Sequence, residues 1–277
     1  MSDKDLRIET ITETNIDDEL LGVIDKITKK RYANGILSEE EDSIVIETRA
    51  NLIINGKFYI SIMCLPRYFE EMAIGFIFSE GLIESVDEIK KISHTCTGNI
   101  FIFTYKPVDM QRSEKRVLIT GCANGSVNIS FLDEENHRPL REDTRIDAAF
   151  IVKRMSQFSK QSKVFVETGA VHSAALVFKD GEGVFFEDIG RHNAVDKVIG
   201  TALKQNLDIN SGILFISGRI SSEIAIKAAR LGISILVSQA APTSISVAVA
   251  EKVGMTLVGF ARGQRFNVYT GSHRILT

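Results

Sequence analysis

The second half of the chain alternates strand-like and helix-like segments, and this pattern limits the fold more than any other feature. From about residue 174, short apolar runs are separated by segments with helical spacing. The runs are almost continuously apolar, which is typical of strands that are buried on both faces. Strands that alternate with helices form a largely parallel sheet covered by those helices. The sequence therefore predicts an α/β fold here.

The order of the predicted elements follows from the same periodicity. A helix begins after Asp147, a good N-cap, and buries a stripe that includes Ile151, Met155 and Phe158. Tight turns and further helices then join the strands of the sheet. The predicted strands are 174–178, 184–186, 213–216, 233–237 and 256–260, and the predicted helices are about 193–204, about 222–231 and a segment after Pro242.

The first half predicts a smaller α+β unit. Asn55-Gly56 is the dipeptide that best tolerates a tight hairpin turn, and it separates two apolar runs. A helix follows Pro66 and ends near Gly81, and further strands are predicted at 44–47, 100–105 and 117–120. Residues 137–147 are polar and charged. We therefore expect a small α+β domain over 1–145 and an α/β domain over 146–277.

Composition excludes several classes of protein. The 277 residues carry a formal charge of only −3, with Lys and Arg spread along the chain, so no basic face for nucleic acid is expected. No apolar run approaches the roughly 20 residues that span a bilayer, and the first 20 residues lack the features of a targeting peptide. Three cysteines are an odd count for a disulfide scaffold, so we expect a cytoplasmic protein that does not insert into membranes.

Polar, glycine-rich segments follow four of the predicted strands. They span 187–193, 217–221, 238–243 and 261–265, and in α/β sheets ligands bind at loops of this kind. Their Ser, Thr and Asn residues are also ordinary helix caps. Helix-start N–H groups and guanidinium groups together favour a phosphorylated ligand. The pattern therefore indicates a nucleotide or a nucleotide-bearing cofactor, and the arginines that carry it are Arg191, Arg219, Arg262 and Arg265.

Two histidines lie in these regions. His192 forms an acid–base group with Glu187 and Asp188 in one interpretation, and only packs at a helix start in the other. His172 does not fit a zinc deaminase, because such a site needs His-x-Glu and a later cysteine pair. The residue two positions after His172 is Ala174, and no cysteine follows Cys122. We therefore expect no zinc.

The three cysteines differ in their surroundings. Cys64 and Cys96 lie near apolar strand patterns and are expected to be small core residues. Cys122 lies in 121–126, a run of small residues after a predicted strand, which indicates an exposed loop. The sequence alone leaves two interpretations of Cys122, a reactive thiol and an incidental loop cysteine.

These segments together resemble the formate dehydrogenase accessory sulfurtransferase family (FdhD). The similarity runs in order over about residues 44–270, and its longest motif is the unusual stretch 187–197. The motifs are Asn55-Gly56, Gly75-Phe76, 79–83, the Cys122 loop, 168–172, 187–197, 217–221, 241–243 and 259–263.

The resemblance implies a sulfur carrier for formate dehydrogenase. Such a protein accepts persulfide sulfur from a cysteine desulfurase and passes it to the bis(molybdopterin guanine dinucleotide) molybdenum cofactor. The resemblance also implies a homodimer and a carboxyl-terminal cytidine-deaminase-like fold without the zinc site. It places the persulfide on Cys122 and the guanine dinucleotide on residues 260–265, which are Phe260, Ala261, Arg262, Gly263, Gln264 and Arg265.

We add to this cofactor site the residues that follow two other predicted strands, and GDP should serve as a fragment of the cofactor. Those residues are Gly190, Arg191, His192, Asn193, Ser217, Gly218 and Arg219. Many family members have Cys-x-x-Cys in the cysteine loop, but here the second position is Gly125. A relay through Cys122 alone remains chemically complete. Two alternatives stay open: a cofactor delivery module without sulfur transfer, and a hydrolase that uses Cys122, His192 and Asp188.

Overall fold

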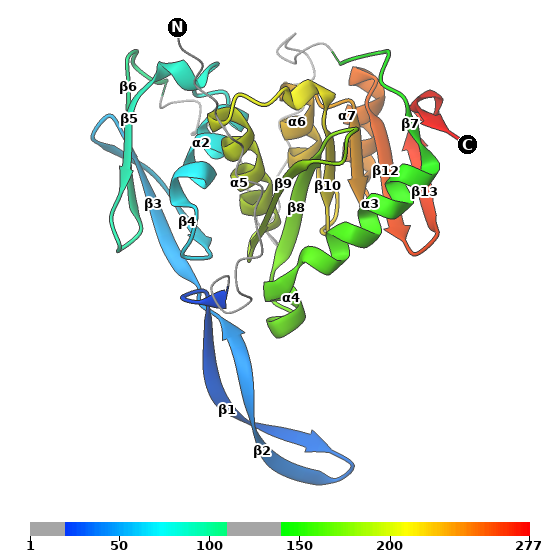
Figure 1. The fold of residues 1–277 in the computed structure, drawn as a ribbon. Helices are drawn as coiled ribbons and strands as arrows, with labels where there is room; N and C mark the ends of the chain where they lie inside the picture. Colours follow the sequence, from blue (N-terminus) through cyan, green and yellow to red (C-terminus); the bar gives the residue numbers. More distant parts are fainter. Residues whose placement is uncertain (1–19, 110–139) are drawn as a thin grey trace, which may run out of the picture.

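The computed structural model describes residues 20–109 and 140–277. The predicted strand 117–120 and Cys122 lie outside these residues. The described chain forms a mixed α/β fold with a large sheet, a smaller sheet and helices between them, and a long hairpin projects from this body (Figure 1). The division at 145/146 stays a prediction, and a single hydrophobic core contains residues from both sides of it.

The large sheet has six strands in the order β13-β12-β11-β10-β8-β9. The neighbours β10, β11 and β12 are parallel, whereas the other pairings are antiparallel. The expectation of a largely parallel sheet was therefore wrong. Short turns join β8 to β9 and β12 to β13, and such turns allow only antiparallel neighbours. The strands are β8 (His172–Val177), β9 (Gly183–Asp188), β10 (Ile213–Ile216), β11 (Ile235–Ser238), β12 (Thr256–Arg262) and β13 (Arg265–Thr270).

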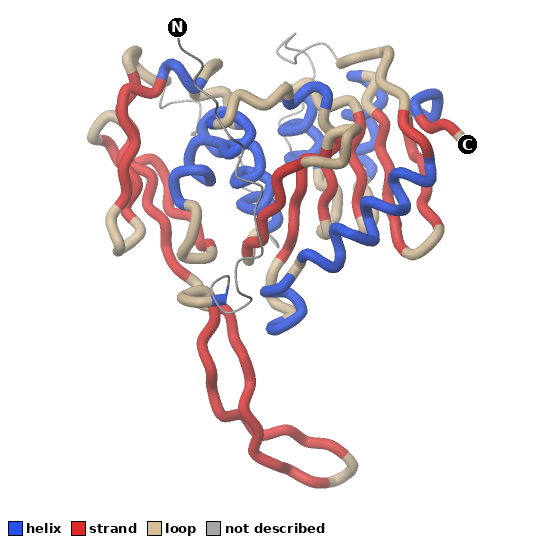
Figure 2. The backbone as a smooth tube through the Cα atoms, in the orientation of Figure 1, coloured by secondary structure: helices blue, strands red, loops and turns tan. Residues whose placement is uncertain are grey.

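Helices cover both faces of this sheet (Figure 2). On one face, Ile151, Met155 and Phe158 of α3 pack against Phe215 and Val237. On the other face, α5, α6 and α7 bury the alternate residues of the same strands in the main core. The helices are α3 (Ala148–Gln161), α4 (Lys163–Thr168), α5 (Arg191–Lys204), α6 (Ser222–Arg230) and α7 (Ser244–Val253).

The smaller sheet has the order β4-β3-β6-β5 and packs on α2 (Phe69–Ser79). The predicted hairpin at Asn55-Gly56 is confirmed: both residues have positive φ, 49° and 79°, and they join β3 to β4. The strands are β3 (Thr48–Ile54), β4 (Lys57–Cys64), β5 (Ile89–His94) and β6 (Asn99–Thr104). Two short strands, β7 (Ile146–Asp147) and β14 (Ile275–Leu276), form a parallel pair with each other. Single 3₁₀ turns lie at Val86–Glu88, Ile209–Ser211 and Ser272–Arg274.

The two halves meet where α2 crosses α5. A Cβ atom built on Gly75 of α2 would lie 1.9 Å from the carbonyl oxygen of Asp196. A Cβ atom built on Gly200 of α5 would lie 1.8 Å from the carbonyl oxygen of Glu71. Each helix therefore presents a glycine to the backbone of the other. This contact fixes α5, and with it the loop before α5, against the first half of the chain.

The projecting hairpin consists of β1 (Ile24–Ala33) and β2 (Ile36–Val45), which were not predicted (Figure 1). Ten-residue strands extend about 33 Å. Asn34 and Gly35 turn the chain with φ of 51° and 83°. Among residues 20–109 and 140–277, the two strands of the hairpin pair with each other alone, and extensive contact with another element is made by β2 with α4. Its tip is apolar and exposed.

Replacing Gly200 by alanine should push α2 and α5 apart, because the new methyl group overlaps the backbone at Glu71. We expect the free energy of unfolding to fall by about 1–3 kcal/mol. Urea denaturation followed by circular dichroism measures this. Ser156→Ala, on the exposed side of α3, is the control and should change stability by less than about 0.5 kcal/mol. Equal stability of both variants would contradict the close helix contact.

Candidate functional site: a cationic sheet edge

The four segments singled out from the sequence lie at one edge of the large sheet. β10, β11 and β12 are parallel, and β9 runs in the same direction because both β9 and β10 are antiparallel to β8. The loops 188–191, 217–221, 239–243 and 262–265 therefore leave the sheet at a common edge, called here the polar edge. β8 begins at this edge as well, which adds its first residue, His172.

The inner part of the polar edge is built around Gly218. A Cβ atom on Gly218 would lie 3.2 Å from Cβ and Cδ of Arg191 and 3.3 Å from Nδ1 of His172. Ser217 Oγ accepts a hydrogen bond from the backbone N–H of Ser173 and lies 3.4 Å from the same Nδ1. Arg191 and His172 therefore both lie next to Gly218, where a larger side chain would press against them. Because Gly218 has no side chain, Arg191 and His172 can pack closely against its backbone.

The inner part is electropositive and partly removed from water. Burial lowers the pKa of Arg191, and the positive charge of Arg219 lowers it further. Burial also lowers the pKa of His172, followed by the charges of Arg191, His192 and Arg219. Arg191 Nε is buried without a hydrogen-bond partner among the described residues. An anion would relieve both the charge repulsion and this unsatisfied donor.

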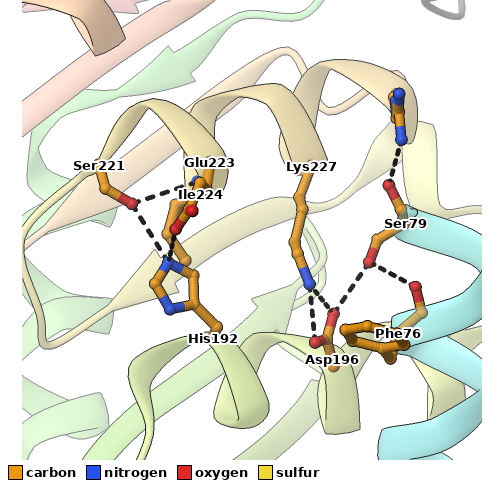
Figure 3. Close-up of polar contacts among 9 residues, drawn as sticks. Phe76, Ser79, His192, Asp196, Ser221, Glu223, Ile224 and Lys227 are labelled. Carbon is orange, nitrogen blue, oxygen red and sulfur yellow. Dashed lines mark hydrogen bonds and ion pairs between the residues drawn. The ribbon is translucent and has the colours of Figure 1, made fainter. Parts of the chain in front are cut away.

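His192 contacts a carboxylate that the sequence did not indicate. Its Nε2 lies 2.9 Å from Oε2 of Glu223 and 3.3 Å from Oγ of Ser221, both at the start of α6 (Figure 3). Burial raises the pKa of Glu223, but the hydrogen bond from His192 and nearby positive charges outweigh this effect, so the pKa is lowered overall. His192 and Glu223 therefore form a carboxylate–imidazole pair beside the polar edge.

The carboxylates first considered as partners of His192 are engaged elsewhere. Glu187 accepts hydrogen bonds from the backbone N–H groups of Val164 and Phe165 at the start of α4. Asp188 is completely buried, and its Oδ2 lies 2.6 Å from Nζ of the equally buried Lys197. Neither carboxylate orients His192. In the part of the chain that the structure describes, Glu223 is the carboxylate in contact with His192.

Asp188 instead organises the start of α5. It accepts hydrogen bonds from the backbone N–H groups of Gly190 and Leu65 and from the side chain of Asn193. The Asn193 amide also donates to the carbonyl oxygen of Met63 at 2.7 Å. Both amide hydrogens of Asn193 are therefore used inside the protein. Asn193, expected to bind the cofactor, holds the loop of Gly190 against the end of β4.

A second buried ion pair supports the far side of α5. Nζ of Lys227 donates to both carboxylate oxygens of Asp196, at 2.6 and 2.7 Å, and Ser79 Oγ donates to the same carboxylate (Figure 3). Lys227 also lies 5.4 Å from the centre of the Phe76 ring. Burial raises the pKa of Asp196, while Lys227 opposes the shift. This network connects α2, α5 and α6 beside His192 and Glu223, about one turn further along α5 and α6 (Figure 3).

The outer part of the polar edge is the turn between β12 and β13. Arg262 is exposed, and its Nε–H donates to the carbonyl oxygen of Gln239 at 2.9 Å. Phe260 is exposed with φ of 53°, and Gly263 follows with φ of 58°. Arg265 pairs with Arg262 across the turn and is also exposed, as are Gly263 and Gln264, whereas Ala261 is buried. This part offers an open, positively charged surface.

Other features of the molecule lie away from this edge. A depression of about 440 Å³ lies at the opposite edge of the sheet, with Arg141, Lys179 and Asp208 among its residues. In the described ranges 20–109 and 140–277, no cluster of His, Cys, Asp or Glu is suited to hold a metal ion. The absence of zinc itself stays a prediction. No helix of the described chain is long and apolar enough to cross a membrane.

The fold and its polar edge define a mixed α/β protein with a surface suited to a phosphorylated ligand. The chain belongs to the FdhD/NarQ family, whose model matches residues 45–276. It is 36% identical over 257 residues to the sulfur carrier protein FdhD of Wolinella succinogenes, covering 91% of this chain and 88% of that protein. It is 34% identical over 258 residues to the Bacillus subtilis protein of the same name, covering 91% and 98%.

A solved structure has the same fold. It is a formate dehydrogenase accessory protein from Desulfotalea psychrophila, with a TM-score of 0.77 and 29% sequence identity. The match covers 92% of this chain and all of that one. The family expected from the motifs is therefore confirmed. The cytidine-deaminase-like description of the carboxyl-terminal half stays a prediction.

Proposed function

We propose that this protein is a sulfur carrier required for formate dehydrogenase activity. The observation that carries the proposal is its similarity, over about nine tenths of the chain, to proteins named sulfur carrier protein FdhD. In this proposal Cys122 receives sulfur from a cysteine desulfurase. The sulfur then passes to the bis(molybdopterin guanine dinucleotide) molybdenum cofactor, which is cargo rather than a resident group.

The sulfur transfer balances with one cysteine. The Cys122 thiolate attacks the outer sulfur of the desulfurase persulfide, the S–S bond of that persulfide breaks, and the desulfurase thiolate leaves. The new Cys122 persulfide then transfers its outer sulfur to the cofactor: the S–S bond breaks and Cys122 leaves as the thiolate. The transferred sulfur is reduced to sulfide by two electrons from the molybdenum of the cargo, which is oxidised from Mo(IV) to Mo(VI). No second thiol is consumed, so Gly125 in place of a second loop cysteine does not interrupt this sequence.

The two described cysteines, Cys64 and Cys96, differ as candidates for the carrier. Cys64 is buried, and burial, followed by the negative charge of Asp188, raises its pKa to about 12. Its thiol is therefore protonated at neutral pH and is a weak nucleophile. Cys96 is exposed, contrary to the expectation of a core residue, and it lies in the turn between β5 and β6. Cys122 lies outside the described residues, so its assignment rests on the family resemblance.

We place the guanine dinucleotide of the cofactor at the polar edge. Arg191 and Arg219 offer positive charge in the inner part, and Arg262 and Arg265 offer it in the outer part. The starts of α5 and α6 add backbone N–H groups at the same edge. GDP carries the guanosine and the diphosphate and is therefore a suitable probe.

The remaining parts of the proposal concern partners and location. We propose a cytoplasmic homodimer that meets a cysteine desulfurase and the catalytic subunit of formate dehydrogenase. The projecting hairpin supports contact between subunits, because Tyr32, Ile36 and Leu37 at its tip are 65–71% exposed. Apolar side chains grouped in this way are typical of surfaces that are covered in an assembly. Sedimentation velocity reports the subunit number, and a monomer would contradict this part.

Cys122→Ala should fold normally but fail to carry sulfur, because the resemblance assigns the persulfide to Cys122 and the thiol of Cys64 is buried with a raised pKa. After incubation with a desulfurase and cysteine, mass spectrometry should find one added sulfur on Cys122 in the wild type and none in the variant. The variant should not restore formate dehydrogenase activity in a strain lacking the native protein. Cys64→Ala and Cys96→Ala serve as controls and should restore it.

Full activity of Cys122→Ala would favour the delivery module without sulfur transfer. The hydrolase alternative needs a base oriented by Asp188, which instead pairs with Lys197. A hydrolase would have to use Glu223 as the group that orients His192. Loss of activity in Cys122→Ala without any persulfide on the wild-type protein would favour that alternative.

Arg262→Ala should weaken GDP binding by about 10- to 100-fold, because a charge-assisted hydrogen bond contributes about 1.5–3 kcal/mol. Isothermal titration calorimetry measures the affinity, and Arg262→Lys should recover only part of it. Arg49→Ala, an exposed arginine on the smaller sheet, is the matched control and should bind GDP like the wild type. Equal affinity of Arg262→Ala and the wild type would move the nucleotide away from the outer part of the edge.

A further inference from the structure

His172 occupies a position that the proposed function does not use. It is the first residue of β8, between β9 and β10, so its side chain enters the inner part of the polar edge. Its Nδ1 lies 3.4 Å from Oγ of Ser217 and beside Gly218, and the side chain of Arg191 borders the same glycine. The imidazole is therefore close to Arg191, whose buried Nε has no hydrogen-bond partner among the described residues.

The charged groups around His172 are mostly positive. Arg191 and His192 come from α5, and Arg219 comes from the loop before α6. Three carboxylates lie on neighbouring elements, and each is engaged by another group. Glu223 of α6 contacts His192, Asp188 of β9 pairs with Lys197, and Glu187 of β9 accepts from the α4 backbone.

We propose that His172 is a phosphate-binding residue of the polar edge and that it takes up a proton from solution when the phosphate binds. This inference rests on the proposed function, because it concerns the same nucleotide site. It assigns the diphosphate to the inner part of the edge, between the starts of β8, α5 and the loop of Gly218. It also makes binding of the phosphorylated ligand dependent on pH.

His172 should gain a proton on binding because the phosphate changes the charge around its imidazole. Burial and the neighbouring cations hold the pKa of His172 below its ordinary value, so the imidazole of the ligand-free protein is neutral at pH 7. A phosphate group offsets those cations and favours the charged imidazolium. One proton moves from solvent to His172, and no other atom is gained or lost. Without the phosphate, a proton here would add another positive charge beside Arg191.

The phosphorylated ligand should bind more tightly at lower pH. The bound state has the higher pKa, so it binds more protons than the free state between the two pKa values. Affinity for the phosphorylated ligand therefore increases as pH falls through that window. Above the higher pKa, His172 is neutral in both states and contributes no pH dependence.

The test is an NMR titration of the histidine ring signals of the full-length protein. Spectra are recorded across pH without ligand, with GDP and with pyrophosphate, and NaCl keeps the ionic strength equal. We expect the pKa of His172 to rise by about 1 unit or more with either ligand, since an opposite charge at contact distance shifts a pKa by this amount. His273, exposed near the carboxyl terminus, is the internal control and should not shift.

Calorimetry in two buffers of different ionisation enthalpy provides a second readout. Wild-type protein should take up protons on binding GDP, and His172→Gln should lose that uptake and bind GDP about tenfold more weakly. His273→Gln is the matched control and should behave like the wild type. Any protonation of GDP itself is present in all three proteins, so the difference between them isolates His172.

The outcomes separate the two proposals. Binding of GDP with an unchanged pKa of His172, or equal proton uptake in His172→Gln, would overturn this inference and leave the nucleotide site standing. A shift with pyrophosphate but no binding of GDP would keep His172 as a phosphate-binding residue and contradict the guanine-dinucleotide assignment. No shift with either ligand would overturn this inference.

Discussion

The contact between α2 and α5 positions the start of α5 at the polar edge. Gly75 and Gly200 let the two helix backbones approach so closely that a Cβ atom at either position would overlap a carbonyl oxygen. The contact joins the smaller sheet to the large one through a continuous hydrophobic core. Because α5 begins at Arg191, its position also sets where the first arginine and His192 lie.

Two buried ion pairs stabilise α5 and the loop before it. Asp188 with Lys197, and Asp196 with Lys227, satisfy charges inside the protein that would be costly if unpaired. Both acids lie within or next to α5, and each uses a lysine as its partner. Among the described residues, Asp188 and Asp196 are thus engaged by lysines, and Glu223 is the carboxylate that acts on Arg191 at the polar edge. A chain of net charge −3 can in this way present a local cationic surface.

Much of the fold could be predicted from local patterns, because strand and helix periodicities and turn dipeptides act over a few residues. The predicted strand 213–216 and the helices starting near 148, 193 and 222 agree closely with β10, α3, α5 and α6. The hairpin of β1 and β2 was missed, because its residues are largely charged and lack the alternation of a half-buried strand. The predicted parallel direction was also wrong for β8 with β9 and for β12 with β13, because a short turn joins the two strands of each pair.

The site was predictable in its residue types but not in its pairings. Glycines and arginines after strands were expected to lie together, and the structure brings them to one sheet edge, since strand ends are visible in the sequence. Which carboxylate meets His192 depends on the packing of α5 against α6, which no local pattern contains. Glu223 is one charged residue in the first turn of a helix, where acids are common for other reasons. Asn193 looked like a ligand residue, yet it bonds Met63 and Asp188.

The central claim is that the polar edge binds the phosphorylated end of the cofactor, and a crystal structure of the protein with GDP tests it most directly. The diphosphate should lie against Arg191, Arg219 and His172, with the guanosine toward the turn of residues 262–265. Nucleotide bound instead in the depression near Arg141 and Lys179, at the opposite edge of the sheet, would contradict the claim.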